Sequence, residues 1–213
     1  MRIGILGSGE VGQKLGLGFA TLGHEVKIGT REPGGDKLKP WLVGAGGKAS
    51  TGTFAETAAF GELLVLATAW SGTQSALQLA GAPNTGGKVV IDATNPLDFS
   101  GGGPALAVGF KDSAGEQVQR WLPRARVVKA FNIVGNQFFF RPELPGGPPT
   151  MFYAGNDAAA KADVKKILDD FGWESIDLGG LENARYLEPM AMVWIVHGFT
   201  SKTWNHAFKL LRK

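Results

Sequence analysis

Cysteine is absent from the 213 residues of this chain, and its absence excludes several chemistries at once. Disulfide bonds, thiolate catalysis and cysteine–metal sites are all ruled out. Histidine is scarce: His24, His197 and His206 are the only three, and none belongs to a His/carboxylate cluster with metal-ligand spacing. We therefore expect no metal centre, and we expect the histidines to be structural, surface or interface residues.

Long apolar runs and a large excess of one charge are missing as well. No apolar run reaches the roughly 18 residues that span a membrane, and 22 basic residues are nearly balanced by 19 acidic ones. The basic residues are dispersed, without the stripe typical of nucleic-acid binding. The N-terminus enters a strand-like run directly, so no secretory signal is predicted. These absences predict a cytoplasmic protein that binds neither nucleic acid nor a membrane.

Strand-like and helix-like segments alternate along the chain. Hydrophobic residues make up 44% of it and charged residues only 19%, which suits a large buried core. Strands are predicted at Arg2–Leu6, Glu25–Gly29, Lys48–Ser50, Glu62–Thr68, Lys88–Asp92, Arg126–Ala130, Met151–Ala154 and Trp173–Asp177. Helices are predicted at Glu10–Leu22, Asp36–Gly44, Thr53–Phe60, Ser71–Leu79, Gly115–Leu122, Asp157–Phe171, Asn183–Val196 and Thr200–Leu211. This alternation predicts an α/β fold with a Rossmann-type, doubly wound and mostly parallel sheet.

The segment Gly7-Ser8-Gly9-Glu10-Val11-Gly12 is the most informative motif in the chain. It joins the first predicted strand to the first predicted helix, and in this setting such a segment forms a cradle for phosphate groups. The first glycine allows a tight turn, the second lets the backbone approach a pyrophosphate, and the third lets helix and strand pack closely. The motif therefore predicts a dinucleotide-binding site.

The end of the second predicted strand distinguishes between the two nicotinamide dinucleotides. Enzymes that prefer NAD usually place a carboxylate there for the ribose 2′-hydroxyl, whereas this chain has Thr30 and Arg31. A hydroxyl and a guanidinium suit a 2′-phosphate, because arginine forms charge-assisted bidentate bonds. Glu32 is a rival ribose ligand one residue later, and Lys37 is either a phosphate ligand or a surface lysine. We expect NADP(H).

Three further segments follow predicted strands on the side where such sheets bind ligands. They are Ala67-Thr68-Ala69-Trp70, Asp92-Ala93-Thr94-Asn95-Pro96-Leu97 and Lys129-Ala130-Phe131-Asn132-Ile133-Val134-Gly135. We expect Ala67–Trp70, Ala93, Asn95 and Pro96 to contact the cofactor, and Asn95, Asn132 and Ile133 to contact the substrate. The Trp70 ring either contacts ligand or packs internally, and Asp92 and Lys129 are expected as a structural pair beneath the site.

Familiar proton donors are missing from these segments. Neither Tyr153 nor Tyr186 is followed four residues later by lysine, so no Tyr-x-x-x-Lys pair exists. Reduction of a carbonyl usually needs such a donor beside the hydride path. Transfer of hydride to a flavin or deazaflavin ring needs less help, because the ring delocalises the electrons. We therefore predict no catalytic side chain and a ring-shaped acceptor.

Five segments together resemble the coenzyme F420-dependent NADP oxidoreductase family: Arg2–Arg31, Leu63–Trp70, Val89–Leu97, Val127–Gly135 and Gly179–Val196. The resemblance implies hydride exchange between NADPH and a deazaflavin, and a homodimer built partly from the C-terminal helices. It also implies that the helix Asn183–Met190 packs beside the nicotinamide, which makes Met190 a substrate contact. On this basis we expect residues 1–180 to form the NADP(H)-binding domain and residues 181–213 a helical extension.

The resemblance leaves the identity of the acceptor open. Archaeal deazaflavin reductases carry a histidine where this chain has Asn132. The segment Lys129–Asn132 is equally similar to the NADPH-binding domain of transmembrane ferric reductases, which pass hydride to a flavin. The acceptor is therefore coenzyme F420 or a flavin, and a non-catalytic NADP(H) sensor is the third reading. The run Phe138-Phe139-Phe140 is expected to fill a core or an interface in preference to walling the acceptor.

Replacement of Arg31 tests the cofactor assignment. Arg31→Ala should weaken NADPH binding by about 1.5–3 kcal/mol, because a charged hydrogen bond to the 2′-phosphate is lost. Binding of NADH, which lacks that phosphate, should remain nearly unchanged. Titration calorimetry with both dinucleotides measures the difference, and equal losses for the two would contradict the assignment.

Overall fold

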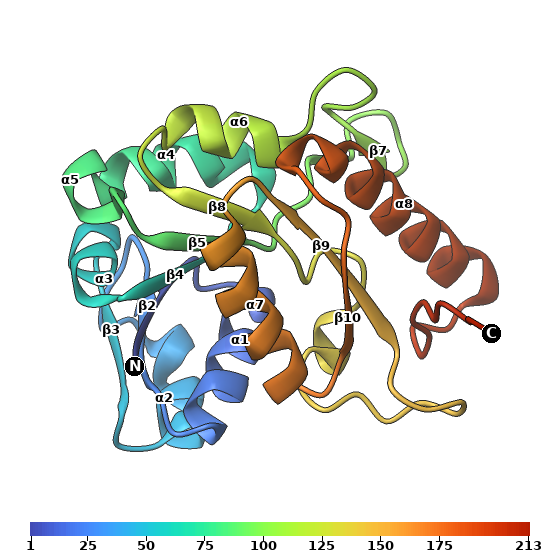
Figure 1. Cartoon of the computed structure of the whole chain (residues 1–213). Helices are drawn as coiled ribbons and strands as arrows, with labels where there is room; N and C mark the ends of the chain where they lie inside the picture. Colours follow the sequence, from blue (N-terminus) through green and yellow to red (C-terminus); the bar gives the residue numbers. More distant parts are fainter.

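Eight strands form the central sheet of the computed structural model, which describes all residues 1–213 (Figure 1). The strands run in the order β10-β9-β8-β5-β4-β1-β2-β3. Their bounds are β1 Arg2–Leu6, β2 Glu25–Gly29, β3 Ala49–Gly52, β4 Leu63–Leu66, β5 Val89–Asp92, β8 Arg126–Lys129, β9 Thr150–Gly155 and β10 Glu174–Asp177. All neighbours pair in parallel except β8 and β9. The predicted α/β, Rossmann-type sheet is confirmed.

Helices cover both faces of this sheet. One face carries α1 (Glu10–Thr21), α2 (Lys39–Ala45) and α7 (Ala158–Asp170), and the other carries α3 (Phe54–Phe60), α4 (Trp70–Ala80) and α6 (Ala114–Trp121). Short elements fill the connections: α5 (Ala82–Thr85), the 3-10 turns η1 (Asp36–Leu38), η2 (Asn136–Phe138) and η3 (Leu181–Asn183), and the hairpin β6 (Leu97–Asp98) with β7 (Ala105–Leu106). No helix is both long enough and apolar enough to cross a membrane.

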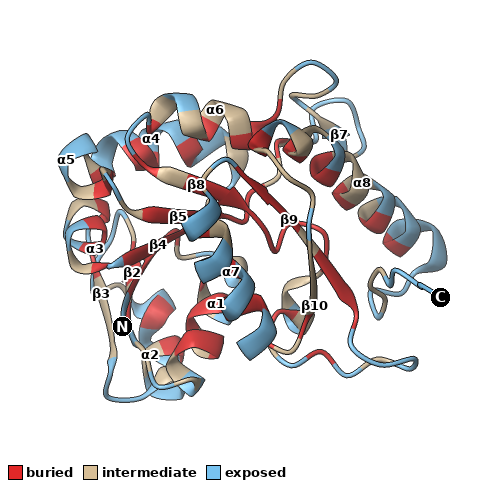
Figure 2. Cartoon of the chain, viewed as in Figure 1, coloured by how far each residue is buried: buried red, intermediate tan, exposed pale blue.

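Two hydrophobic clusters, one on each face, explain why the central strands are mostly apolar and β4 is apolar throughout. In β4, Leu63 and Val65 join the cluster beneath α1, whereas Leu64 and Leu66 join the cluster beneath α4. Figure 2 shows β4 and β5 buried along their whole length. Because side chains alternate between faces, a strand covered on both sides is apolar at every position. Each fully buried leucine contributes about 1.5–3 kcal/mol.

The C-terminal segment differs from its prediction. Helix α8 runs without interruption over Ala184–Ser201, and the helix predicted at Thr200–Leu211 is wrong. Lys202 takes a left-handed conformation, with φ of 56°, which ends α8. The following residues fold back onto β9, where the Thr150 amide donates to the Phe208 carbonyl at 2.8 Å. Tertiary contacts therefore outweigh the helical pattern in this tail.

Helix α8 lies on the side of the sheet occupied by β9 and β10 (Figure 1). Its first residue, Ala184, is fully buried in the cluster beneath α4 and α6, which joins the helix to the main body. Phe139 is 2% exposed and Phe140 packs edge-on against Phe171, so the core interpretation of the Phe138–Phe140 run is confirmed. The division of the chain at residue 180 stays a prediction.

Candidate functional site

The turn after β1 has a shape that only glycine permits at two of its positions. Gly7 has φ of 128°, and a Cβ there would lie 2.3 Å from the Ala67 carbonyl oxygen. A Cβ on Gly12 would lie 2.2 Å from the Gly7 carbonyl oxygen. Gly9 is different, because no atom lies within 4 Å of the place its Cβ would occupy. Two glycines thus close the turn, and the third leaves open space beside the start of α1.

This turn forms one wall of a cavity of about 660 Å³ at the carboxyl edge of the sheet. The cavity lies at the switch point of the strand order, where β1 has β4 on one side and β2 on the other. Nine predicted cofactor residues line it: Gly7, Ser8, Gly9, Thr30, Arg31, Lys37, Ala67, Thr68 and Ala69. Sequence segments that are far apart in the chain therefore meet at one site.

Cationic side chains are available at one end of this cavity. Arg31 and Lys37 are exposed and form no salt bridge, so both are free to meet an anion. Thr30 lines the cavity as well, and its hydroxyl oxygen accepts from the Ser8 hydroxyl and from the Glu32 amide, both at 3.3 Å. Glu32 also lines the cavity, so its position leaves it as a possible ribose ligand.

Helices α3 and α4 also line the cavity, and the sequence alone did not predict that their residues belong to the site. These residues are Phe54 from α3 and Ser71, Gly72, Ser75, Ala76 and Leu79 from α4. None of them belongs to a recognisable motif. Their approach to the glycine turn depends on how α3 and α4 pack on the sheet, and only the three-dimensional structure determines that packing.

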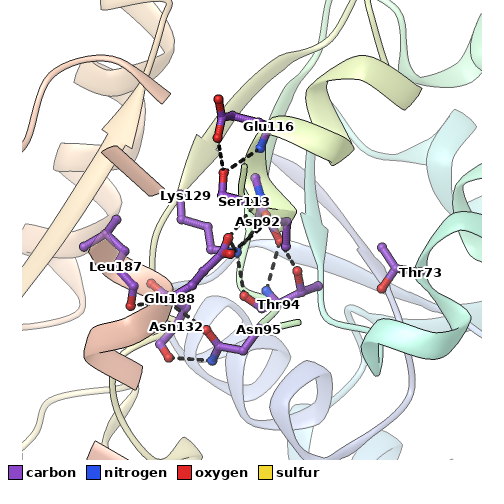
Figure 3. A network of polar contacts seen from close by, with 12 residues as sticks. Thr73, Asp92, Thr94, Asn95, Ser113, Glu116, Lys129, Asn132, Leu187 and Glu188 are labelled. Carbon is purple, nitrogen blue, oxygen red and sulfur yellow. Dashed lines mark hydrogen bonds and ion pairs between the residues drawn. The ribbon is translucent and has the colours of Figure 1, made fainter. Parts of the chain in front are cut away.

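A pair of asparagines lies outside this cavity, in the turns after β5 and β8 (Figure 3). The Asn95 amide donates to the Asn132 backbone carbonyl at 2.8 Å, and the Asn132 amide donates to Asn95 Oδ1 at 3.0 Å. Asn132 also donates to the Leu187 carbonyl of α8 at 3.0 Å. Its own Oδ1 is buried without a donor. The preceding residue, Phe131, has φ of 64°, a strained conformation for a bulky side chain.

Lys129 forms a buried ion network next to the asparagine pair (Figure 3). Its Nζ lies 3.0 Å from Asp92 Oδ2 and 2.9 Å from Glu188 Oε1, and it donates to the Thr94 carbonyl at 2.6 Å. All three charged side chains are at most 1% exposed. Burial favours the neutral amine, but the two carboxylates outweigh burial and hold the pKa of Lys129 above its usual value. The expected structural pair is confirmed, with Glu188 as an unforeseen third member.

Glu188 also connects α8 to α6. Its carboxylate accepts from the Ala114 and Gly115 amides, at 2.9 and 3.0 Å, at the N-terminus of α6. A second contact joins the same helices nearer the surface, where Arg185 Nε donates to Glu116 at 2.8 Å. The bond from Arg185 lowers the pKa of the Glu116 carboxyl group. The sequence did not predict this role of Glu188, because its partners Lys129, Ala114 and Gly115 lie more than 50 residues away in the chain.

The remaining predicted site residues lie around these two centres. Glu10 accepts from the Asn136 amide at 3.3 Å, so the glycine turn touches the segment after β8. Val11 and Met190 are partly buried, and Gly12, Ala93, Pro96 and Ile133 are buried. The Trp70 ring stacks on Trp121 with centroids 5.5 Å apart, which matches the packing interpretation for that ring. None of these eight predicted site residues lines the cavity.

The Rossmann-type fold and the site at the carboxyl edge of its sheet are those of an NADP-dependent oxidoreductase. The family described as "NADP oxidoreductase coenzyme F420-dependent" matches residues 2–96. The chain is also 31% identical over 209 residues to the F420-dependent NADP reductase of Methanothermobacter marburgensis, which covers 92% of this chain and 91% of that protein. It therefore belongs to the F420-dependent NADP oxidoreductase family.

Two further relatives, one a solved structure and one a longer protein, are similar to this chain. A crystal structure of a provisionally assigned F420-dependent NADP reductase from Arthrobacter sp. FB24 superposes with a TM-score of 0.94, at 41% identity over the whole of both chains. The metalloreductase STEAP3 of Rattus norvegicus is 25% identical over 90% of this chain. The chain spans only 36% of that longer protein. The predicted resemblance to both the deazaflavin-linked and the metalloreductase proteins is confirmed.

Removal of the buried ammonium group should be costly. Lys129→Met leaves Asp92 and Glu188 as buried charges without a cation, so the free energy of unfolding should fall by about 3–5 kcal/mol. Urea denaturation measures the loss. Arg120→Met is the matched control, because it breaks the surface pair with Asp112 and should cost no more than about 1 kcal/mol. Similar small losses for both variants would show that the network contributes little to stability.

Proposed function

We propose that this protein transfers hydride between NADPH and a deazaflavin of the coenzyme F420 type. The observation that carries the proposal is the pairing of a cavity with free cations and a neighbouring site of neutral amides. The cavity suits a phosphorylated dinucleotide, and the amide site suits a ring that needs little proton transfer. The names of the Methanothermobacter and Arthrobacter relatives support the same acceptor.

The residues present fit NADP(H). The open space at Gly9 and the amides at the start of α1 suit the pyrophosphate, with Gly7, Ser8, Glu10, Val11 and Gly12 shaping the turn. Thr30 and Arg31 would hold the 2′-phosphate, and Lys37 lies close enough to add charge. Ala67, Thr68, Ala69 and Trp70 would border the cofactor through their backbone. When bound, the cofactor supplies the hydride at its nicotinamide ring.

The turns after β5 and β8 would receive the nicotinamide end. Ala93, Asn95 and Pro96 approach from one turn, and Asn132 and Ile133 from the other. Asn132 Oδ1 is a buried acceptor without a donor, and a buried unpaired acceptor suits a ligand amide that can donate. Met190 on α8 would border the acceptor ring. Each of these groups binds or orients, and none is placed to exchange a proton.

Two other functions fit the same site less fully. A flavin replaces the deazaflavin in the first, which the likeness to the rat metalloreductase favours. In the second the protein binds NADP(H) as a sensor without transferring hydride, which the lack of an acid–base side chain favours. We rank the deazaflavin above both, because the relatives that match along their whole length carry that name.

Helix α8 supports a homodimer. Val193, Val196 and Phe199 are between 51% and 60% exposed on one helix, which is unusual for three large apolar side chains. A second copy of the chain would cover them. The helix would then serve both as a wall of the acceptor site and as an interface.

Stopped-flow mixing distinguishes the acceptors. With the wild-type protein and excess NADPH, oxidation should be at least about tenfold faster with coenzyme F420 than with a flavin mononucleotide, a barrier difference of about 1.4 kcal/mol. The loss of NADPH absorbance and the bleaching of the acceptor are followed together, with NADH as the control donor. A faster reaction with the flavin would favour the metalloreductase-like function, and tight NADPH binding without any oxidation would favour the sensor.

Sedimentation velocity tests the dimer. The wild-type chain should sediment as a dimer at micromolar concentration, and Val193→Glu should shift it to a monomer, because a charge is then buried in the interface. Lys165→Glu on α7 introduces the same acidic side chain away from α8 and should leave the dimer intact. A wild-type monomer at every concentration tested would refute the dimer.

A further inference from the structure

The ion network next to the asparagine pair is built from three separate parts of the chain. Asp92 ends β5, Lys129 ends β8, and Glu188 lies one turn into α8. Residues within three positions of each of these also meet beside the network: Asn95, Asn132 and Leu187. The same three elements are therefore joined twice, once by charges and once by amides.

The charged layer controls the position of the amide layer. Asp92 Oδ1 accepts from the Thr94 amide at 2.9 Å and from its hydroxyl at 2.7 Å, and Lys129 donates to the Thr94 carbonyl. Thr94 is thus held at three of its polar atoms, and Asn95 is the next residue. The turn that carries Asn95 cannot shift without breaking bonds to buried charged groups, which are stronger than neutral ones.

The charged residues also fix the position of α8 relative to the sheet and to α6. Glu188 is bound on one side by Lys129 and on the other by the two amides of α6. This places the Leu187 carbonyl where it accepts from Asn132, whose backbone follows the strained Phe131. Strain of this kind persists only where the surroundings impose it. Here the hydrogen bonds of Asn132 to Asn95 and to the Leu187 carbonyl of α8 hold the backbone that follows Phe131.

We propose that Glu188 is a positioning residue for hydride transfer. It acts through Lys129 and α8 to hold Asn132 and Asn95, and it has no contact with the reacting atoms of its own. This inference rests on the proposed function, since it needs the asparagine pair to border the nicotinamide. Glu188 therefore sets the geometry of the donor and acceptor rings, while the cavity around Arg31 sets cofactor affinity independently.

Glu188→Gln tests this role against a matched control. The variant keeps the shape of the side chain and removes its charge, so Lys129 loses one partner. Glu116→Gln makes the same change in the other contact between α6 and α8, the pair with Arg185, which has no link to Lys129. The rate of hydride transfer to coenzyme F420 should fall between about tenfold and a hundredfold in Glu188→Gln, as misplacement of reacting groups does. It should change by less than about twofold in Glu116→Gln.

Two readouts separate positioning from a merely structural role: the KM for NADPH and the primary isotope effect. The KM for NADPH should stay within about threefold in Glu188→Gln, because the contacts that bind the cofactor remain. The primary isotope effect with NADPH deuterated at the transferred position should increase as the chemical step slows. A structural defect would instead reduce the fraction of active protein and leave the isotope effect unchanged. An unchanged isotope effect with a lower rate would overturn the proposal.

A double variant keeps the proposal falsifiable if Glu188→Gln is poorly folded. Lys129→Met with Glu188→Gln removes one cation and one anion together, so no unpaired glutamate charge remains buried. It should unfold at a temperature closer to wild type than Lys129→Met does, and its hydride transfer should stay slow. Recovery of the wild-type rate together with stability would overturn the proposal.

The wild-type reaction is measured in parallel with every ring acceptor. Absence of hydride transfer from the wild-type protein to all of them would contradict the proposed function itself.

Discussion

The ammonium group of Lys129 is the interaction on which the functional half of this molecule depends. It lies at the carboxyl end of β8, fully buried, between a carboxylate from β5 and one from α8. An ionised group at such depth is tolerated only with charged partners and hydrogen bonds on all sides. Each partner therefore fixes a different element. The sheet, the turn after β5 and the C-terminal helix are held in one arrangement because one charge requires all of them.

The other half of the site depends on the absence of side chains. At Gly7 and Gly12 the backbone approaches itself too closely for a Cβ, and at Gly9 it leaves space open. The first two positions make the turn tight, and the third keeps the start of α1 accessible. The cationic side chains of Arg31 and Lys37 line the same cavity and form no salt bridge. The edge of the sheet thus combines a rigid amide site with an open, positively charged one, which suits a ligand with an unreactive anchor and a reactive ring.

Local patterns predicted the sheet well, because burial on two faces makes its central strands nearly continuous apolar runs. They predicted the tail poorly: the apolar residues after Lys202 follow a helical pattern, yet they bind β9 instead. In the site, the glycine turn and Thr30-Arg31 could be predicted as cavity residues because each is a pattern of adjacent residues at the end of a strand. Phe54, Ser75 and Leu79 could not, because their helices reach the cavity only after packing on the sheet. The same holds for Glu188, whose partners come from β8 and α6.

The sequence by itself determined the class of fold, and it predicted where a phosphate-binding turn would lie and, from Thr30 and Arg31, a preference for NADP(H). These features depend on spacing within a strand, a turn and a helix, so neighbouring residues suffice to specify them. The tertiary structure alone decided that Asn95 and Asn132 face each other, that α8 reaches them, and that Glu188 completes the charge network. Those contacts join residues 37 to 74 positions apart, and only the packing of the strands and α8 brings such residues within hydrogen-bonding distance.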